Sequence, residues 1–330
     1  MVTRASSSSL YYQARWNTQN ENLQDSLFDK VSKFFFSHIH RFLTSLAVPS
    51  TTFTQARIIR SDQNHRNILS TLKCTQTEIN IRTPDNKNIK GSLICPQGTS
   101  LSDPVVIFAQ PNASVSVEST FIDTMQEIIK LNKKCNFILF DYRGSGFSKG
   151  SLLQAKDLVL DLDSVYMFAK EQLKIPTQDI HMMGFSLGGA VTSQVKAMHP
   201  ECTGNTVIDR SFSNIIDIAS SLVKKNAIIS FLARHVLRLL GWGWLNSTEA
   251  FKKIKSPSLI LHHPKDYIIK EEFQLQRTID TRQRNIQTIN LNNLNWAPCD
   301  NFHCVPLSMF IYERNTVSSA VAKFLTQKPK

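Results

Sequence analysis

One short run of residues constrains the fold of this chain more than any other. An apolar stretch at 179–183 leads directly into Gly184-Phe185-Ser186-Leu187-Gly188-Gly189. This G-x-S-x-G pattern after a strand is typical of a sharp strand-to-helix turn that lifts one serine hydroxyl clear of a sheet. Glycine suits the positions around the serine because the backbone there is strained and crowded. We therefore predict a nucleophile elbow with Ser186 at its tip.

The distribution of glycine supports this interpretation. The chain has only 11 glycines in 330 residues, and six of them lie in two short segments, 144–150 and 184–189. In a chain so poor in glycine, such clustering indicates positions where the backbone needs it. The alternative is an ordinary glycine-rich turn after a buried strand.

The hydrophobic pattern around the elbow alternates between strands and helices. Apolar or alternating runs predict strands over 77–82, 89–95, 105–110, 136–141, 180–184, 206–209, 258–261 and 286–291. Helical spacing predicts helices over 118–131, 158–173, 190–198, 271–281 and 317–325. This alternation predicts an α/β fold with a mostly parallel central sheet and helices on both faces.

The N-terminal part of the chain lies outside this alternation. We divide the chain into an extension, residues 1–70, and a main domain, residues 71–330. Apolar residues recur every three or four positions over 27–46, which predicts an amphipathic helix that basic residues make too polar to span a bilayer. This helix either packs on the main domain, which we favour, or lies on a membrane surface. The polar, serine-rich start of the chain lacks the apolar core of a secretory signal, so we expect a cytoplasmic protein.

A second irregularity is the segment 214–255, which interrupts the alternation with apolar helical stretches. We expect it to form a helical insertion over the sheet. Trp242 and Trp244 within it suggest an apolar lining for a substrate, and a packed lid without substrate contact is the alternative. The segment is also locally basic, which favours a peripheral contact with an anionic membrane.

Composition narrows the classes of partner. The formal net charge is +12, but the basic residues are spread along the chain, so we expect no nucleic acid partner. The six cysteines show no metal-ligand spacing, and we expect neither a metal nor a cofactor.

A serine nucleophile needs a base, and the base needs an orienting acid. In elbow-type folds the chain order is serine, acid, histidine. Asp266 follows the strand over 258–261 in a polar loop, which places it at the carboxyl edge of the sheet on the same rim as Ser186. We favour Asp266 over two rivals, Asp209 at the end of the preceding strand and Asp280 in a predicted helix.

The remaining catalytic groups follow from the same order. His303 is the histidine between the last predicted strand and the last predicted helix, and we assign it as the base. The oxyanion would be bound by the backbone N–H of Leu187 and by that of Asn112, in the loop after the strand over 105–110. Pro111 precedes Asn112 and has no N–H to donate.

A second motif joins the elbow. Many α/β-hydrolases have a D-Y-R-G-x-G-x-S loop that resembles the run Asp141-Tyr142-Arg143-Gly144-Ser145-Gly146-Phe147-Ser148. The chain is thus similar, over about 76–325, to the superfamily of serine esterases, lipases and thioesterases. The resemblance implies an α/β-hydrolase fold in which the insertion at 214–255 takes the place of the cap. One departure is Gln110-Pro111, where the family usually has His-Gly, and it affects the oxyanion loop. The layout also resembles uncharacterised hydrolases that intracellular bacteria deliver into host cells, which would make the protein a secreted effector.

We therefore expect a serine hydrolase that cleaves a small-molecule or lipid ester with an apolar acyl group. A thioesterase, acyltransferase or peptidase would use the same triad. A non-catalytic binding protein on this fold is the alternative from a different class.

Overall fold

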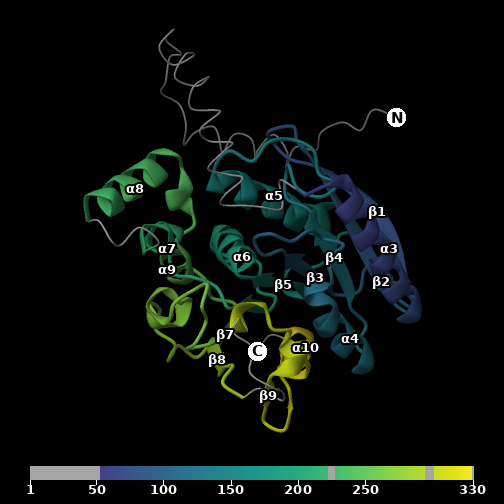
Figure 1. Ribbon diagram of the computed structural model, residues 1–330. Helices are drawn as coiled ribbons and strands as arrows, with labels where there is room; N and C mark the ends of the chain where they lie inside the picture. The colour runs from purple at the N-terminus through teal and green to yellow at the C-terminus, as the bar shows by residue number, and fades with distance from the viewer. Residues whose placement is uncertain (1–52, 222–226, 294–300, 329–330) are drawn as a thin grey trace.

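The computed structural model of the chain describes residues 53–221, 227–293 and 301–328 (Figure 1). The amphipathic helix predicted over 27–46 lies outside these ranges.

An eight-stranded sheet forms the centre of the molecule, with strand order β1-β2-β4-β3-β5-β6-β7-β8. The strands are β1 (Cys74–Arg82), β2 (Asn88–Pro96), β3 (Val105–Ala109), β4 (Asn136–Phe140), β5 (Ile180–Phe185), β6 (Thr206–Asp209), β7 (Ser258–His262) and β8 (Ile286–Asn290). β1 and β2 are antiparallel to each other, β2 is antiparallel to β4, and the remaining neighbours are parallel. The mostly parallel sheet predicted from the sequence is confirmed, and the carboxyl ends of its parallel strands meet at one edge.

Helices cover both faces of this sheet (Figure 1). The main ones are α3 (Gln55–Thr71), α4 (Ile122–Lys130), α5 (Ala155–Met167), α6 (Leu187–Met198) and α10 (Val317–Thr326). Alternate residues of β3 enter different cores: Val105, Ile107 and Ala109 pack with α5 and α6, whereas Val106 and Phe108 pack with α4 and α10. A strand covered on both faces must be apolar on both, which explains its unbroken apolar sequence.

Helix α3 lies within the predicted extension but packs on the main domain. Thr54 caps it by accepting the Arg57 N–H at 3.3 Å. Leu69 enters the core shared with α4 and α10, and Ile58 packs with Val115 and Val117 in the loop after β3. The described part of the extension is therefore joined to the domain by apolar contacts.

A helical insertion follows β6, as the sequence predicts. It contains α7 (Ile215–Ser221), α8 (Ala227–Leu239), a 3₁₀ turn at Trp242–Trp244 and α9 (Ser247–Phe251). Further along, a short hairpin of β9 (Ile311–Tyr312) and β10 (Asn315–Thr316) precedes α10. None of the helices in the described ranges is both long and apolar enough to cross a membrane.

The helix predicted over 271–281 is wrong. Two 3₁₀ turns, Glu271–Phe273 and Leu275–Arg277, occupy this segment, with Gln274 in extended conformation between them. The buried Gln274 amide donates to the carbonyls of His263 (2.7 Å) and Ile269 (2.8 Å). These two bonds hold the backbone at Gln274 out of a helix, so Asp280, expected inside it, lies in the turn region that follows.

Candidate active site

The turn from β5 into α6 is a strained elbow with Ser186 at its tip. Ser186 has φ 52° and ψ −115°, a conformation that is costly for a residue with a side chain. Its N–H donates to the Asp209 carbonyl (2.9 Å), and its own carbonyl accepts the Ser211 hydroxyl (2.7 Å). Bonds to the end of β6 thus hold the elbow in place.

Two glycines make this turn sterically feasible. A Cβ atom at Gly188 would collide with the carbonyl oxygen of Ala109 at the end of β3. One at Gly184 would collide with the Gly188 carbonyl across the turn. The glycines at these positions therefore allow α6 to approach β3, as the motif predicts.

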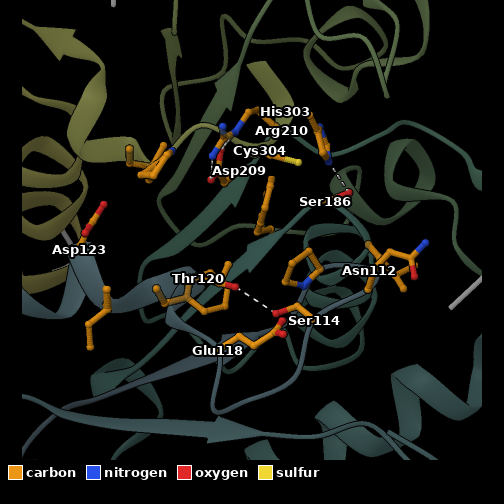
Figure 2. Close-up of a pocket in the computed structure, with 18 of the residues that line it drawn as sticks. Asn112, Ser114, Glu118, Thr120, Asp123, Ser186, Asp209, Arg210, His303 and Cys304 are labelled. Carbon is orange, nitrogen blue, oxygen red and sulfur yellow. Dashed lines mark hydrogen bonds and ion pairs between the residues drawn. The ribbon is translucent and has the colours of Figure 1, made fainter. Parts of the chain in front are cut away.

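The structure brings Ser186, Asp266 and His303 into contact. His303 Nε2 lies 3.0 Å from the Ser186 Oγ (Figure 2). His303 Nδ1 lies 2.7 Å from Asp266 Oδ2. All three side chains are buried, with 7%, 4% and 6% of Ser186, Asp266 and His303 exposed. The chain of bonds fits a neutral imidazole that donates from Nδ1 to the carboxylate and accepts the serine hydroxyl proton at Nε2.

The acid is fixed by its own loop. Asp266 Oδ1 accepts the N–H groups of Ile268 (2.9 Å) and Ile269 (2.8 Å), which leaves Oδ2 for His303. Asp209 was the rival acid weighed from the sequence. Its carboxylate instead accepts two hydrogen bonds from the neighbouring Arg210, from Nε to Oδ1 and from Nη2 to Oδ2, both at 2.8 Å.

Arg210 also supports the loop that carries His303. Its Nη1 donates to the carbonyls of Phe302 (2.9 Å) and Val305 (2.6 Å), on either side of that histidine. The guanidinium carbon lies 4.7 Å from the centre of the Phe185 ring, which in turn lies 5.1 Å from the His303 ring. Sequence reasoning missed this residue, because its contacts join segments more than 90 residues apart in the chain.

The two predicted oxyanion donors line the same cavity as Ser186. Leu187 is the first residue of α6, and Asn112 is in the loop after β3. Among the described residues neither backbone N–H has a hydrogen-bond acceptor. Helix starts leave such donors free, and the helix dipole favours negative charge beside them.

The D-Y-R-G segment braces the loop that carries Asn112. Asp141 Oδ1 accepts the Ser116 N–H (2.6 Å) and Oδ2 accepts the Phe147 N–H (2.9 Å), so one carboxylate joins the two loops. Burial raises the pKa of Asp141 to about 6. At the departure from the family pattern, the Gln110 side chain is buried, and neither of its polar atoms has a hydrogen-bond partner among the described residues.

Above the serine is a cavity of about 1280 Å³ that spans several elements. One part is lined by apolar side chains of the insertion and the acid loop, namely Phe212, Ile215, Ile218, Ile268 and Ile269. The helix α3 and the segment after β3 contribute polar side chains, namely Ser61, Asn64, His65, Asn67, Ser114 and Thr120, together with the apolar Ile68, Val117, Phe121 and Ile122.

Neither Trp242 nor Trp244 is among the residues that line this cavity. Trp242 is buried in the core shared with α5, and the ring of Trp244, a residue 40% exposed, lies 5.7 Å from the Lys156 ammonium. Their 3₁₀ turn packs against α5, so the structure corrects the expectation of a tryptophan lining. Ile215 and Ile218 of α7 supply the apolar wall instead.

Known proteins share this architecture. The chain is 25% identical over 178 residues to the α/β hydrolase domain-containing protein WAV2 of Arabidopsis thaliana, which covers 50% of this chain and 54% of that protein. The chain therefore spans about half the length of this curated relative.

Solved structures extend the comparison. An α/β hydrolase from Vibrio vulnificus matches with a TM-score of 0.58 and 14% identity, covering 82% of this chain and 90% of that one. Est1E from Butyrivibrio proteoclasticus, solved with ferulic acid, matches with a TM-score of 0.56 and 14% identity, covering 76% and 98%. The esterase Pf2001 from Pyrococcus furiosus matches with a TM-score of 0.50 and 19% identity, covering 67% and 82%. At these identities the likeness shows the α/β-hydrolase fold.

A family model, described as Chlamydia CHLPS protein (DUF818), matches residues 106–290, which is more than half of the chain and includes the elbow. The chain belongs to this family and, through its sheet, elbow and relatives, to the α/β-hydrolase superfamily.

Proposed function

We propose that this protein is a serine hydrolase that cleaves a carboxylic ester by way of an acyl-enzyme. The observation that carries the proposal is the unbroken contact chain from Ser186 through His303 to Asp266 beside a large cavity. A serine becomes nucleophilic when a positioned base takes its proton, and this geometry supplies such a base.

The proposed reaction has two halves. Ser186 Oγ attacks the ester carbonyl carbon while His303 Nε2 takes the hydroxyl proton, and the N–H groups of Leu187 and Asn112 stabilise the oxyanion. Collapse of the tetrahedral intermediate breaks the C–O bond, and His303 returns the proton to the leaving alcohol. A water molecule then repeats the sequence on the acyl-enzyme and releases the acid. Asp266 holds the histidine and stabilises its charged form.

The cavity supports an ester with an apolar acyl part. Phe212, Ile215 and Ile218 offer a surface on which an acyl chain can lose its contact with water. Thioesters and amides share the chemistry, so a substrate panel must separate these activities. A non-catalytic binding protein would not need the serine, base and acid in hydrogen-bonding contact, and that contact favours the enzyme.

We also propose a peripheral contact with an anionic membrane through α8. Phe231, Val236 and Leu239 are exposed on this helix, Leu239 to 87%, and Arg238 is an exposed basic neighbour. Exposed apolar side chains beside a positive charge are typical of helices that lie on anionic bilayers. In co-sedimentation with phosphatidylserine vesicles, Leu239→Glu should reduce binding several-fold, whereas Leu101→Glu, at another exposed leucine, should not. Equal binding by both variants would contradict the contact.

The experiment that tests the activity compares hydrolysis of short- and medium-chain p-nitrophenyl esters, thioesters and anilides by the parent and two variants. Ser186→Ala should lose roughly three orders of magnitude or more in kcat, because the covalent step has no nucleophile. Ser193→Ala is the control, since that hydroxyl lies in the same helix and donates to the Gly189 carbonyl (2.8 Å). A folded Ser186→Ala protein with parental turnover would refute the mechanism.

A further inference from the structure

The acid and the base of the proposed triad come from two separate loops. Asp266 lies in the acid loop, residues 263–270, which follows β7, and His303 lies in the base loop, residues 301–306. The 2.7 Å contact between Asp266 Oδ2 and His303 Nδ1 joins positions 37 residues apart in the chain. Its geometry therefore depends on how the two loops are held against each other.

His263 forms a direct contact between these loops. It follows β7 immediately, three residues before Asp266, and only 3% of it is exposed. Its ring stacks on the ring of Phe302, the residue before His303, with 4.1 Å between the ring centres and 12° between the planes. Two nearly parallel rings in contact attract each other beyond the burial of their surface, so this stack links the acid loop to the base loop.

Hydrogen bonds fix the same histidine within the acid loop. His263 Nδ1 accepts the Lys265 N–H (3.0 Å), and the His263 carbonyl accepts the Asp266 N–H (3.1 Å) and the Gln274 side-chain amide (2.7 Å). Burial lowers the pKa of His263, as Arg210 and Lys265 also do, which outweighs the opposite effect of Asp266. The ring is therefore neutral near pH 7, and its Nδ1 can accept a proton from the backbone.

The base loop is anchored on its own side of the stack. The Phe302 carbonyl accepts Arg210 Nη1 (2.9 Å), and the ring of the fully buried Phe310 lies 5.9 Å from the His263 ring. His263 thus has aromatic contacts with residues that precede and follow His303 in the chain. Arg210 joins the base loop to the end of β6, whereas His263 joins it to the acid loop.

We propose that His263 is a positioning residue that sets the contact between Asp266 and His303 by stacking on Phe302. This role rests on the proposed hydrolysis, in which the carboxylate must hold the imidazole while the proton moves. His263 is not among the residues that line the cavity, so it acts on the rate through the triad and leaves substrate binding alone.

Two variants separate the stack from the turn of the acid loop. His263→Asn keeps a side-chain acceptor for the Lys265 N–H but loses the ring, so kcat on a water-soluble p-nitrophenyl ester should fall roughly tenfold while KM changes by less than about twofold. His263→Phe keeps the ring and should retain kcat within about threefold of the parent. Parental kcat in a folded His263→Asn protein, or equal losses in both variants, would overturn the role of the stack.

The chain offers a matched control for the loss of the ring. His235 is exposed on α8, its ring centre lies 4.1 Å from that of Phe231, and its Nδ1 lies 2.9 Å from the Phe231 carbonyl. This pair resembles the stack of His263 on Phe302 but links no catalytic loops. His235→Asn should therefore keep parental kcat and KM on the same ester.

A change on the other side of the stack tests the link independently of the His263 variants. Phe302→Leu should lower kcat by a similar factor, roughly tenfold, and adding His263→Asn should cost little more, because both changes remove one contact. Additive losses would show that the two rings act separately and would contradict the proposal.

Proton NMR separates this inference from the proposed activity. A proton held between an imidazole nitrogen and a carboxylate resonates far downfield, and its absence in His303→Ala assigns it to that residue. We expect this resonance in the parent and in His263→Phe, and its broadening or loss in His263→Asn. If the parent cleaves no ester but this difference is found, the activity is wrong and the positioning stands. If esters are cleaved and the resonance is unchanged in His263→Asn, the positioning is wrong and the activity stands.

Discussion

At the scale of single residues, Arg210 links two loops that meet beside the catalytic serine. It neutralises the buried Asp209 and donates to the carbonyls of Phe302 and Val305. The charge pair and the loop contacts depend on the fork geometry of one guanidinium, which a lysine cannot reproduce. The position of His303 is therefore tied to the end of β6.

Replacing Arg210 by lysine should lower kcat roughly 10- to 100-fold, because small displacements of a catalytic base cost this much. KM should change less, since Arg210 does not need to touch the substrate for this effect. Steady-state kinetics on a water-soluble ester would measure both constants, with a thermal melt to show cooperative folding. Arg282→Lys, at an exposed arginine paired with Asp280, is the control. Parental kcat in a folded Arg210→Lys protein would contradict the positioning role.

Chain order carries the information for three of the predicted site residues. The elbow motif selects Ser186, and the order of serine, acid and histidine selects Asp266 and His303; their mutual contacts are observed, while their catalytic roles stay predictions. Arg210 could not be found this way, because its importance comes from contacts between distant segments. An arginine after a strand has no distinctive sequence pattern.

At the scale of elements, the approach of α6 to β3 depends on Gly188. A methyl group there would overlap the Ala109 carbonyl, which belongs to the backbone and cannot rotate away. The elbow, the first turn of α6 and the loop after β3 would all have to shift together.

We therefore expect Gly188→Ala to destabilise the fold by about 3 kcal/mol and to reduce activity, because overpacking of this kind costs on the order of 1–3 kcal/mol. Gly243→Ala is the matched control, since a Cβ there would make an ordinary contact with Ile216 at 3.5 Å. Urea unfolding followed by circular dichroism would measure both. Equal midpoints for the two variants would show that the helix does not need this close approach.

Elements with strong periodicity were predictable, and those defined by side-chain contacts were not. The buried strands and the terminal helix α10 appear within a few residues of the predicted bounds. The helix expected over 271–281 is absent because the buried Gln274 amide bonds to the acid loop. Such a tertiary contact overrides local helical spacing and leaves no trace in the pattern.

At the scale of the whole molecule, stability toward acid should depend on a buried histidine in the central sheet. His181 in β5 accepts the Asn205 N–H at Nδ1 (2.9 Å), and burial, together with the nearby Lys196, lowers its pKa to about 4. In the unfolded chain the pKa of histidine is about 6.5. Between these values the unfolded state binds a proton that the folded state does not, so stability falls as the pH falls from about 6.5 to about 4.

His181→Asn keeps an acceptor for Asn205 but has no group that titrates in this range. Between about pH 7 and pH 4 the parent should lose up to about 3 kcal/mol more unfolding free energy than the variant, since each pKa unit corresponds to about 1.4 kcal/mol. Urea titrations at several pH values would give the two curves. Parallel curves would show that His181 does not titrate in this way.

The account of the whole molecule depends on an activated serine beside a large cavity. Labelling with a fluorophosphonate probe, followed by intact mass and peptide mapping, measures that activation directly without knowledge of the natural ester. We predict one equivalent of label on Ser186 in the parent, none in Ser186→Ala and much slower labelling in His303→Ala. A well-folded parent that does not react, or that reacts at another residue, would contradict the central claim.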